Sequence, residues 1–235
     1  MACNGEISRQ SIRRFLGPYL NRPAKTYNNI VDGLKAFVVR YLQKPELING
    51  FKHTYVPDNF ERLVPTKEQL RKSFEALNDD KEKAIFLFFA TTGLRRSELW
   101  NLTKEDVDFE TQCVKAKHDT RTKRAGVTFY NDECETYLKK YLESRKDDSN
   151  KLFRISNYQF YFMWKNTTKA AEFKITPQVL RKWHSTELGE LMVPDRYVDI
   201  FQGRAPRSVL SKHYTAKGSE ILKRIYEKAN LRVLT

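Results

Sequence analysis

The segment that decides the fold is Ala84-Ile-Phe-Leu-Phe-Phe-Ala-Thr-Thr-Gly-Leu-Arg-Arg-Ser-Glu-Leu99. Its first seven residues are the most apolar run of the chain and predict a core helix over 81–92 that ends at Gly93. The run is much shorter than the ~18 residues of a membrane span. Arg95 follows directly, and a guanidinium fixed beside a core is costly unless an anion meets it. Arg95 therefore either pairs with Glu98 for structural reasons or binds an anionic substrate.

Outward from this segment, helical patterns dominate in both directions. Thr66 and Gln69 fit a capping box, and Thr176-Pro177 fits an N-cap followed by proline at the first helical position. Two short strands are expected at 108–117 and 126–130, joined by a polar, basic turn. The other predicted helices are 8–16, 24–42, 96–102, 133–145, 157–170, 177–191, 195–202, 206–216 and 219–229. The expected fold class is mainly α with a small antiparallel β-sheet (α+β).

The helix over 24–42 has the strongest amphipathic pattern, and a boundary follows it. Its expected apolar face, with spacing i, i+3, i+4 and i+7, consists of Tyr27, Ile30, Val31, Leu34, Phe37, Val38, Tyr41 and Leu42. A polar stretch with two prolines then places the domain boundary near 52–64. The chain is therefore expected to divide into a helical segment, 1–55, and a larger domain, 56–235.

The charge balance points to a polyanionic partner. Among 235 residues, Lys and Arg number 43 and Asp and Glu 29, which gives a formal net charge of +14. Such a surplus favours nucleic acid over an anionic membrane or a merely basic enzyme surface. The basic residues are spread through folded-looking segments, which indicates a broad basic face rather than a tail. The candidate DNA contacts are Arg13, Lys25, Arg40, Arg121, Arg124 and Lys182.

Several other classes of protein are excluded. Cys3, Cys113 and Cys134 are too few and too far apart for a disulfide framework or a CxxC metal pair. The sequence has none of the GxSxG, HExxH, GxxxxGK[ST] or GxGxxG motifs, so neither a metal nor another cofactor is expected. The first ten residues contain no apolar signal region. We therefore expect a reduced, cytoplasmic protein that does not bind membranes.

The chain resembles one known protein family in four short segments. Thr92-Gly-Leu-Arg-Arg-Ser-Glu-Leu99 resembles the first box of the tyrosine recombinases (the phage-integrase family), whose pattern is TGLR-x-SEL. Gln178-Val-Leu-Arg181 resembles the HxLR box, and Gln202-Gly-Arg204 stands where the family has GH or GW. Tyr214 stands in the place of the family's nucleophile. The resemblance covers about 66–235 and implies a DNA breaking–rejoining fold, preceded by a short core-binding segment that ends with helix 24–42.

The chain departs from this pattern at two positions. Gln178 replaces the histidine of the second box, and Arg204 replaces the histidine or tryptophan of the third. Both replacements resemble the spindle-virus-type integrases of archaeal viruses and plasmids. Neither an amide nor a charged guanidinium accepts a proton at neutral pH, which leaves the general base open. His184, one turn after Arg181, could serve as that base or simply pack in the core, and packing is the favoured interpretation.

The resemblance implies a chemistry for each matched residue. Arg95 and Arg181, with Arg204 as a third donor and Gln178 beside them, would stabilise the charge of a pentavalent phosphorus. Tyr214 would attack the phosphodiester, and Lys123 would protonate the leaving 5′-oxygen, with Lys117 as the alternative acid. The 3′-phosphotyrosyl bond conserves the energy of the phosphodiester, so the reaction needs neither metal nor ATP.

Three functions remain open at this point. The first is a site-specific integrase that acts on a double-stranded recombination site as a homo-tetramer and is a monomer or weak dimer when free. The second is a type IB topoisomerase-like nicking and closing enzyme, and the third is a DNA-binding protein that has lost catalysis. In the first case, the helix over 219–229 either passes to a neighbouring protomer or packs on its own core.

Overall fold

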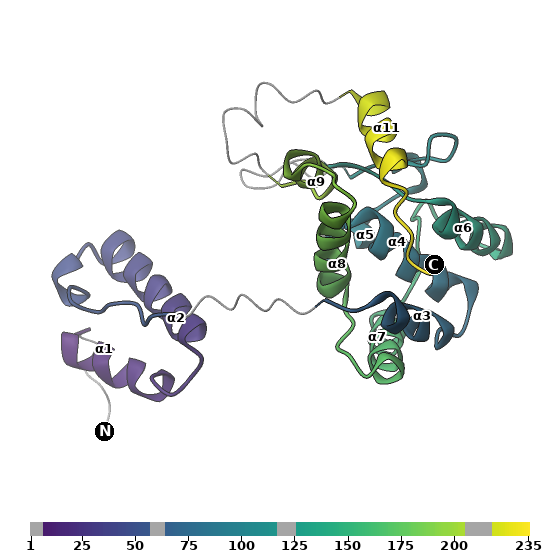
Figure 1. Cartoon of the computed structure of the whole chain (residues 1–235). Helices are drawn as coiled ribbons and strands as arrows, with labels where there is room; N and C mark the ends of the chain where they lie inside the picture. The colour runs from purple at the N-terminus through teal and green to yellow at the C-terminus, as the bar shows by residue number, and fades with distance from the viewer. Residues whose placement is uncertain (1–6, 57–63, 117–125, 205–217) are drawn as a thin grey trace. The chain divides into compact units, whose positions relative to one another are not determined.

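The computed structural model describes residues 7–56, 64–116, 126–204 and 218–235. The chain forms two compact units, Met1–Arg62 (unit 1) and Leu63–Thr235 (unit 2), both drawn in Figure 1. Each unit has a hydrophobic core of its own, so each is described separately.

Over its described residues, 7–56, unit 1 is built from two helices and short turns. α1 spans Arg9–Leu16 and α2 spans Ala24–Ala36, with the 3-10 turn η1 at Gly17–Tyr19 between them. The hydroxyl of Ser8 accepts the N–H of Ser11 at 3.2 Å and thereby begins α1. The buried core of these residues consists of Ile12, Leu16, Tyr27, Val31, Val38 and Ile48.

The structure corrects the last turn of the helix predicted over 24–42. Phe37–Tyr41 (η2) is a π turn, in which the N–H of Leu42 donates to the carbonyl of Phe37, five residues earlier, at 3.1 Å. Val38 is buried, whereas Phe37 and Tyr41 are exposed. The sequence pattern placed both aromatic residues on the apolar face, which is wrong because the wider π turn interrupts the 3.6-residue period.

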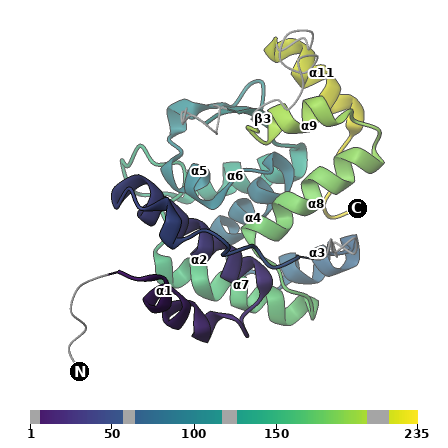
Figure 2. The same cartoon turned by 90° about the vertical axis from the view of Figure 1, so that its left-hand side faces the viewer.

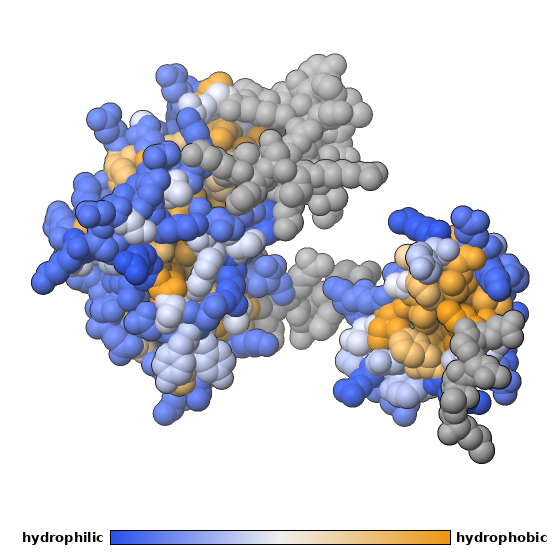
Figure 3. Space-filling view, turned by 180° about the vertical axis from the view of Figure 1, so that it is seen from behind, coloured by the Kyte–Doolittle hydropathy of each residue, from blue (hydrophilic) through white to orange (hydrophobic). Residues whose placement is uncertain are grey.

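Unit 1 exposes many large apolar side chains for its size. Figure 3 shows apolar residues gathered on one face of this unit. Its exposed large apolar residues are Ile7, Phe15, Leu20, Phe37, Val39, Tyr41, Tyr55 and Val56. Apolar surface on this scale is typical of a contact surface.

Unit 2 is organised around α4, Asp80–Thr92, whose residues from Ala84 onward are all buried. α6 (Asp132–Ser144) and α8 (Pro177–Glu190) pack against α4, and α3 (Lys67–Glu75) packs against α7 (Asn157–Ala171). Figure 2 shows this arrangement from the side. The most apolar run of the chain is therefore the central helix of unit 2, as predicted.

The remaining helical elements are short or lie toward the C-terminus. They are η3 (Pro45–Leu47) in unit 1, and α5 (Arg96–Asn101), η4 (Lys104–Asp106), α9 (Asp195–Phe201) and α11 (Ser219–Ala229) in unit 2. The helix predicted over 206–216 falls outside the described residues. Within the described part of the chain, the helices lack the length and apolar character needed to cross a bilayer.

Local signals in the sequence set the ends of the main helices. Thr66 Oγ1 accepts the N–H of Gln69 at 3.2 Å, and Gln69 Oε1 accepts the N–H of Thr66 at 3.0 Å, which confirms the capping box. Thr176 caps α8 by a single bond, in which its hydroxyl accepts the N–H of Val179 at 3.3 Å. Gly93 ends α4 in the left-handed region, with φ +63°, where glycine is strongly preferred.

Among the described residues, the sheet has three antiparallel strands rather than the two predicted. β1 (Val107–Asp108), β2 (Cys113–Lys115) and β3 (Val127–Phe129) pair in that order, with Val114 opposite both Val107 and Thr128. The prediction of one strand over 108–117 is wrong because Asp108 starts a turn. Its carboxylate accepts the N–H groups of Glu110 and Thr111 at 3.0 and 3.1 Å, which breaks the strand. The fold class is confirmed: mainly α with a small antiparallel sheet.

The C-terminal helix packs on the core of its own chain. Leu222 and Tyr226 of α11 are buried, and the Tyr226 hydroxyl donates to the carbonyl of Thr91 at 2.9 Å. After α11, the N–H groups of Val233 and Leu234 donate to the Glu133 carboxylate at 2.8 and 3.1 Å. Of the two expectations for 219–229, the structure shows packing on the chain's own core.

The contact between α11 and α4 gives a testable prediction of stability. Tyr226→Phe leaves the ring in place but removes the donor to the buried Thr91 carbonyl, so we expect the free energy of unfolding to fall by about 1–2 kcal/mol. Urea denaturation followed by circular dichroism measures the change. Tyr137→Phe, on the half-buried side of α6, is the control and should change it by less than about 0.5 kcal/mol. Equal effects of the two substitutions would contradict the assigned role of the Tyr226 hydroxyl.

Candidate active site

Arg181 is a buried arginine on α8, with only 4% of its surface exposed. Its guanidinium donates from Nη1 to the carbonyl of Gly93 and from Nη2 to the carbonyl of Gln202, both at 2.6 Å. Burial and the positive charge of Arg95 lower the pKa of Arg181 to about 10, which still leaves it protonated at neutral pH. Arg181 thus ties the end of α4 to the end of α9.

Arg95 meets Arg181 at a shared carboxylate. The Nη1 of Arg95 lies 2.5 Å from Glu98 Oε1, and the Arg95 N–H donates to Glu98 Oε2 at 2.7 Å. The same Oε2 lies 4.0 Å from Nη1 of Arg181. The ion pair proposed as the structural explanation of Arg95 is therefore present. The arginines of the first and second boxes also converge at one place, which that explanation alone does not require.

Arg204 adds a third guanidinium to this group. Its Nη1 lies 3.2 Å from Asp199 Oδ1, and its own N–H donates to the Asp199 carbonyl at 2.8 Å. Arg204 contributes to lowering the pKa of Arg181, so the two charges lie within electrostatic reach of each other. Within the described residues, these three guanidiniums pair with two carboxylates, which leaves a net positive charge that suits an anionic substrate.

The second arginine of the first box lies differently. Arg96 donates to Asn157 Oδ1 at 3.1 Å, and its guanidinium stacks over the rings of Trp100 and Phe160 at 5.4 and 4.7 Å. These contacts hold α5 against α7. The structure therefore separates a structural role for Arg96 from the convergence of Arg95 with Arg181.

His184 is fully buried beside this group. Gln202 Nε2 lies 3.0 Å from His184 Nδ1, and a Cβ atom at Gly93 would lie 2.6 Å from the same nitrogen. Burial and the positive charge of Arg181 lower the pKa of His184 to about 3, so the ring is neutral at physiological pH. His184 packs in the core, as favoured from the sequence, and does not reach solvent as a general base would.

The other residues singled out in the sequence fall into two groups. Gln178 and Lys182 on α8, and Arg13, Lys25 and Arg40 in unit 1, are exposed. The remaining candidates lie outside the described residues: Lys117, Arg121, Lys123, Arg124 and Tyr214. The structure therefore brings together Arg95, Arg181 and Arg204 and leaves Gln178 on the surface of the first turn of α8.

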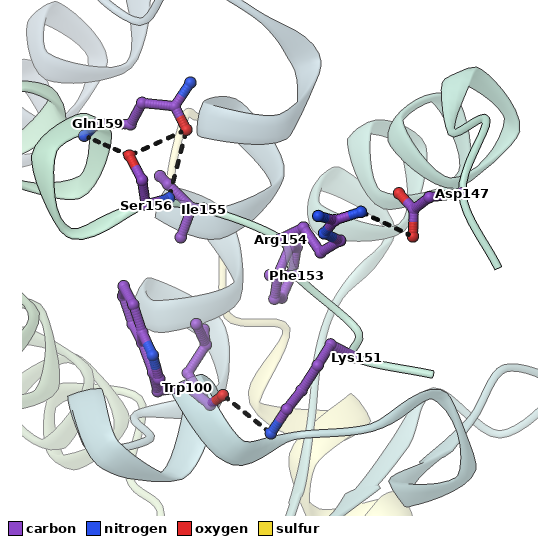
Figure 4. A pocket seen from close by; sticks show the side chains of 9 residues that line it. Trp100, Asp147, Lys151, Phe153, Arg154, Ile155, Ser156 and Gln159 are labelled. Atoms are coloured by element: carbon purple, nitrogen blue, oxygen red, sulfur yellow. Dashed lines mark hydrogen bonds and ion pairs between the residues drawn. The ribbon is translucent and has the colours of Figure 1, made fainter. Parts of the chain in front are cut away.

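A pocket of about 570 Å³ lies elsewhere in unit 2 and does not mark this site. Figure 4 shows its wall, formed by Trp100, Lys151, Phe153 and Ser156 among others. Lys151 Nζ donates to the Trp100 carbonyl at 3.5 Å, and Arg154 lies 3.7 Å from Asp147. The lining includes none of the three converging arginines. Charge convergence, rather than cavity volume, identifies the candidate site.

Sequence reasoning gave no role to Gln202 or Asp199, two residues that the structure places in the site. Gln202 is 1% exposed and follows α9. A signal was present in the sequence, because Val198, Phe201 and Gln202 have the spacing i, i+3, i+4 of one helix face. An amide on an apolar face predicts a buried polar group that needs partners.

Comparison with known proteins identifies the family. Residues 57–220 match the model of the phage integrase family. The tyrosine recombinase XerA of Thermococcus onnurineus is 30% identical, over 97% of this chain and 84% of that protein. The tyrosine recombinase XerA of Pyrococcus furiosus is 28% identical, over 88% of this chain and 75% of that protein.

Solved structures agree in fold. A crystal structure of XerA recombinase aligns with a TM-score of 0.56 and 22% identity, over 97% of this chain and 84% of that one. The Tn1549 transposon integrase in complex with a circular intermediate DNA aligns with a TM-score of 0.64 and 20% identity, over 96% and 86%. These matches show that the helices and small sheet form the fold of a recombinase catalytic domain. The chain thus belongs to the phage integrase family and is a tyrosine recombinase.

Proposed function

We propose that this chain is a site-specific DNA recombinase that cleaves and rejoins DNA through a 3′-phosphotyrosyl intermediate formed by Tyr214. The observation that carries the proposal is the convergence of Arg95 and Arg181 at Glu98, with Arg204 nearby. Relatives named tyrosine recombinase XerA support the same activity.

The three arginines would stabilise the transition state. A phosphodiester in the pentavalent state carries more concentrated negative charge than in the ground state, and prealigned guanidiniums meet that charge without reorganising. Arg181 is held by two carbonyl groups, and the nearest carboxylate oxygen, Glu98 Oε2, lies 4.0 Å from its Nη1, so its charge is only partly compensated. Arg95 and Arg204 reach carboxylates directly and can exchange these partners for phosphate oxygens.

The proposed reaction is a transesterification. The Tyr214 hydroxyl releases its proton to water and its oxygen attacks phosphorus, the bond from phosphorus to the 5′-oxygen breaks, and Lys123 donates a proton to that oxygen. Rejoining reverses these steps. Nearby guanidiniums lower the pKa of a phenol placed beside them, which favours the attacking phenolate. Gln178 is proposed to donate an amide hydrogen bond to the phosphate and not to act as the base, because an amide has N–H donors but does not take up a proton at neutral pH.

The two predicted domains have separate proposed tasks. The segment 1–55 is the core-binding part and carries the exposed cations Arg13, Lys25 and Arg40, and the domain 56–235 is catalytic. Arg121, Arg124 and Lys182 are further proposed phosphate contacts. The protein acts on a double-stranded recombination site in the cytoplasm of its host, as a tetramer on DNA and a monomer or weak dimer when free. Gln178 and Arg204 support placing it among the spindle-virus-type integrases.

The nucleophile is tested with a nicked suicide duplex of the cognate site, which traps the covalent adduct. Tyr214→Phe should abolish the adduct on a denaturing gel, because only the attacking oxygen is lost, and should change the dissociation constant for DNA by less than about threefold. Adduct formation by the phenylalanine variant would assign the reaction to another tyrosine. Adduct without exchange in a two-site assay with the native protein would instead indicate a topoisomerase-like enzyme.

The general acid is tested with a 5′-bridging phosphorothiolate, which expels a thiolate that needs no proton. Lys123→Ala should cleave ordinary DNA poorly and the phosphorothiolate at close to the native rate. Arg95→Ala and Arg181→Ala are the matched controls and should stay slow on both substrates, because phosphorane charge must still be stabilised. Rescue of Lys117→Ala instead would transfer the role of acid to Lys117.

The basic surface predicts a strong dependence of DNA affinity on salt. Each neutralised phosphate contributes about 0.9 to the slope of log K against log salt concentration, so a slope of about −6 or steeper is expected. Fluorescence anisotropy of a labelled duplex between roughly 50 and 200 mM salt measures the slope. A nearly flat dependence would show that the net charge of +14 does not serve DNA binding.

A further inference from the structure

Arg181 and Gln202 form a reciprocal pair of hydrogen bonds between α8 and the end of α9. The side chain of Arg181 donates to the main-chain carbonyl of Gln202 at 2.6 Å. In return, the side-chain Nε2 of Gln202 donates to the main-chain carbonyl of Arg181 at 2.8 Å. Arg181 is 4% exposed and Gln202 is 1% exposed, so water does not compete for the donors and acceptors of either bond. Each side chain therefore binds the main-chain carbonyl of the other residue, and the two bonds together fix the end of α9 relative to α8.

The chemistry of the contacts fixes how the amide of Gln202 is oriented. The Arg181 carbonyl is an acceptor, so the Gln202 amide must turn its nitrogen, not its oxygen, toward it. The second hydrogen on Nε2 then faces His184 Nδ1 at 3.0 Å. His184 Nδ1 is consequently the acceptor, and the ring carries its proton on Nε2. The low pKa of His184 keeps it in this neutral form, which alone accepts the bond.

His184 packs against Gly93 of the first box. Its ring lies so close to Gly93 that any Cβ there would meet it, with the nearest atom 2.6 Å away. The Gly93 carbonyl is the second acceptor of the Arg181 guanidinium. The end of α4, the middle of α8 and the end of α9 thus meet in one buried cluster of four residues: Gly93, Arg181, His184 and Gln202.

We propose that Gln202 and His184 are positioning residues that hold the guanidinium of Arg181 in the orientation needed for catalysis, without touching DNA themselves. This inference rests on the proposed function, because it assigns Arg181 to the transition state. Electrostatic stabilisation depends on donors that are aligned before reaction, and an error near 1 Å weakens it severely. A guanidinium on a flexible side chain needs such fixed acceptors, and both carbonyls that hold it belong to this cluster.

The main test is Gln202→Leu in the full chain. Leucine has a similar size but donates no hydrogen bond, so the Arg181 carbonyl and His184 lose their shared partner. In single-turnover cleavage of saturating suicide duplex, we expect the rate to fall about 10- to 100-fold, less than the loss of a whole aligned donor. The dissociation constant for DNA should change less than about threefold, because the charge of Arg181 remains. Ser73→Ala removes a remote buried hydroxyl and is the control for stability, with a native cleavage rate.

A double-mutant cycle separates positioning from general damage to the fold. In an Arg181→Lys background the planar guanidinium is gone, so Gln202→Leu should slow cleavage by no more than about a further twofold. A full additional loss in that background would overturn the proposal, as would a native rate for Gln202→Leu alone.

At position 184 the matched pair is His184→Asn and His184→Leu, which have similar shapes. Only asparagine keeps an acceptor for Gln202 and should be the faster of the two by tenfold or more.

A spectroscopic measurement tests the cluster without relying on activity. The guanidinium protons of Arg181 are identified in the NMR spectrum of the DNA-free protein as the signals that Arg181→Lys removes. They should exchange slowly with water in the native protein and at least tenfold faster in Gln202→Leu. Unchanged exchange would overturn the role of Gln202. If the native protein forms no covalent adduct, the proposed function fails, whereas this measurement still decides whether Gln202 holds the guanidinium.

Discussion

The fold of unit 2 depends on how the buried end of α4 is completed. A helix leaves its last carbonyl groups without partners, and here those groups lie inside the core, away from water. Three side chains from different elements donate to three successive carbonyls of this end: Tyr226 to Thr91, Thr128 to Thr92, and Arg181 to Gly93. Elements far apart in the sequence, namely α11, β3 and α8, are thereby tied to one short segment. The same segment leads directly into Arg95, so completing the helix and building the site are one structural task.

The sequence predicts those parts of the fold that local chemistry controls. The Thr66 capping box, the proline start of α8 and the glycine end of α4 each depend on a few neighbouring residues, and all are confirmed. The errors occur where the backbone departs from regular structure. The Asp108 carboxylate accepts two backbone N–H groups, which forms a turn and divides a predicted strand. The π turn at 37–41 leaves Phe37 and Tyr41 exposed, whereas the sequence pattern placed both on the apolar face. The hydrophobic periodicity of the sequence does not predict either departure.

For the candidate site, the sequence supplies residue types and tertiary structure supplies the partners. The motif spacing singles out Arg95, Arg181 and Arg204 although 109 positions separate the first from the last. It does not predict that Arg181 is held by two backbone carbonyls, because such acceptors carry no sequence signature. Gln202 is the intermediate case, since its spacing from Val198 and Phe201 predicts burial but not which groups it binds.

The three arginines differ in how their charge is held, and this difference has a consequence for binding. Arg95 and Arg204 rest on carboxylates, so an arriving phosphate must compete with Glu98 and Asp199 for them. Arg181 rests on neutral carbonyls, with Glu98 only at 4.0 Å, so its position is fixed while its charge stays available. Neutral dipoles orient a cation without cancelling it, which is the arrangement that electrostatic preorganisation requires. A neutral His184 fits the same logic, because an imidazolium beside Arg181 would add repulsion and could no longer accept the Gln202 amide.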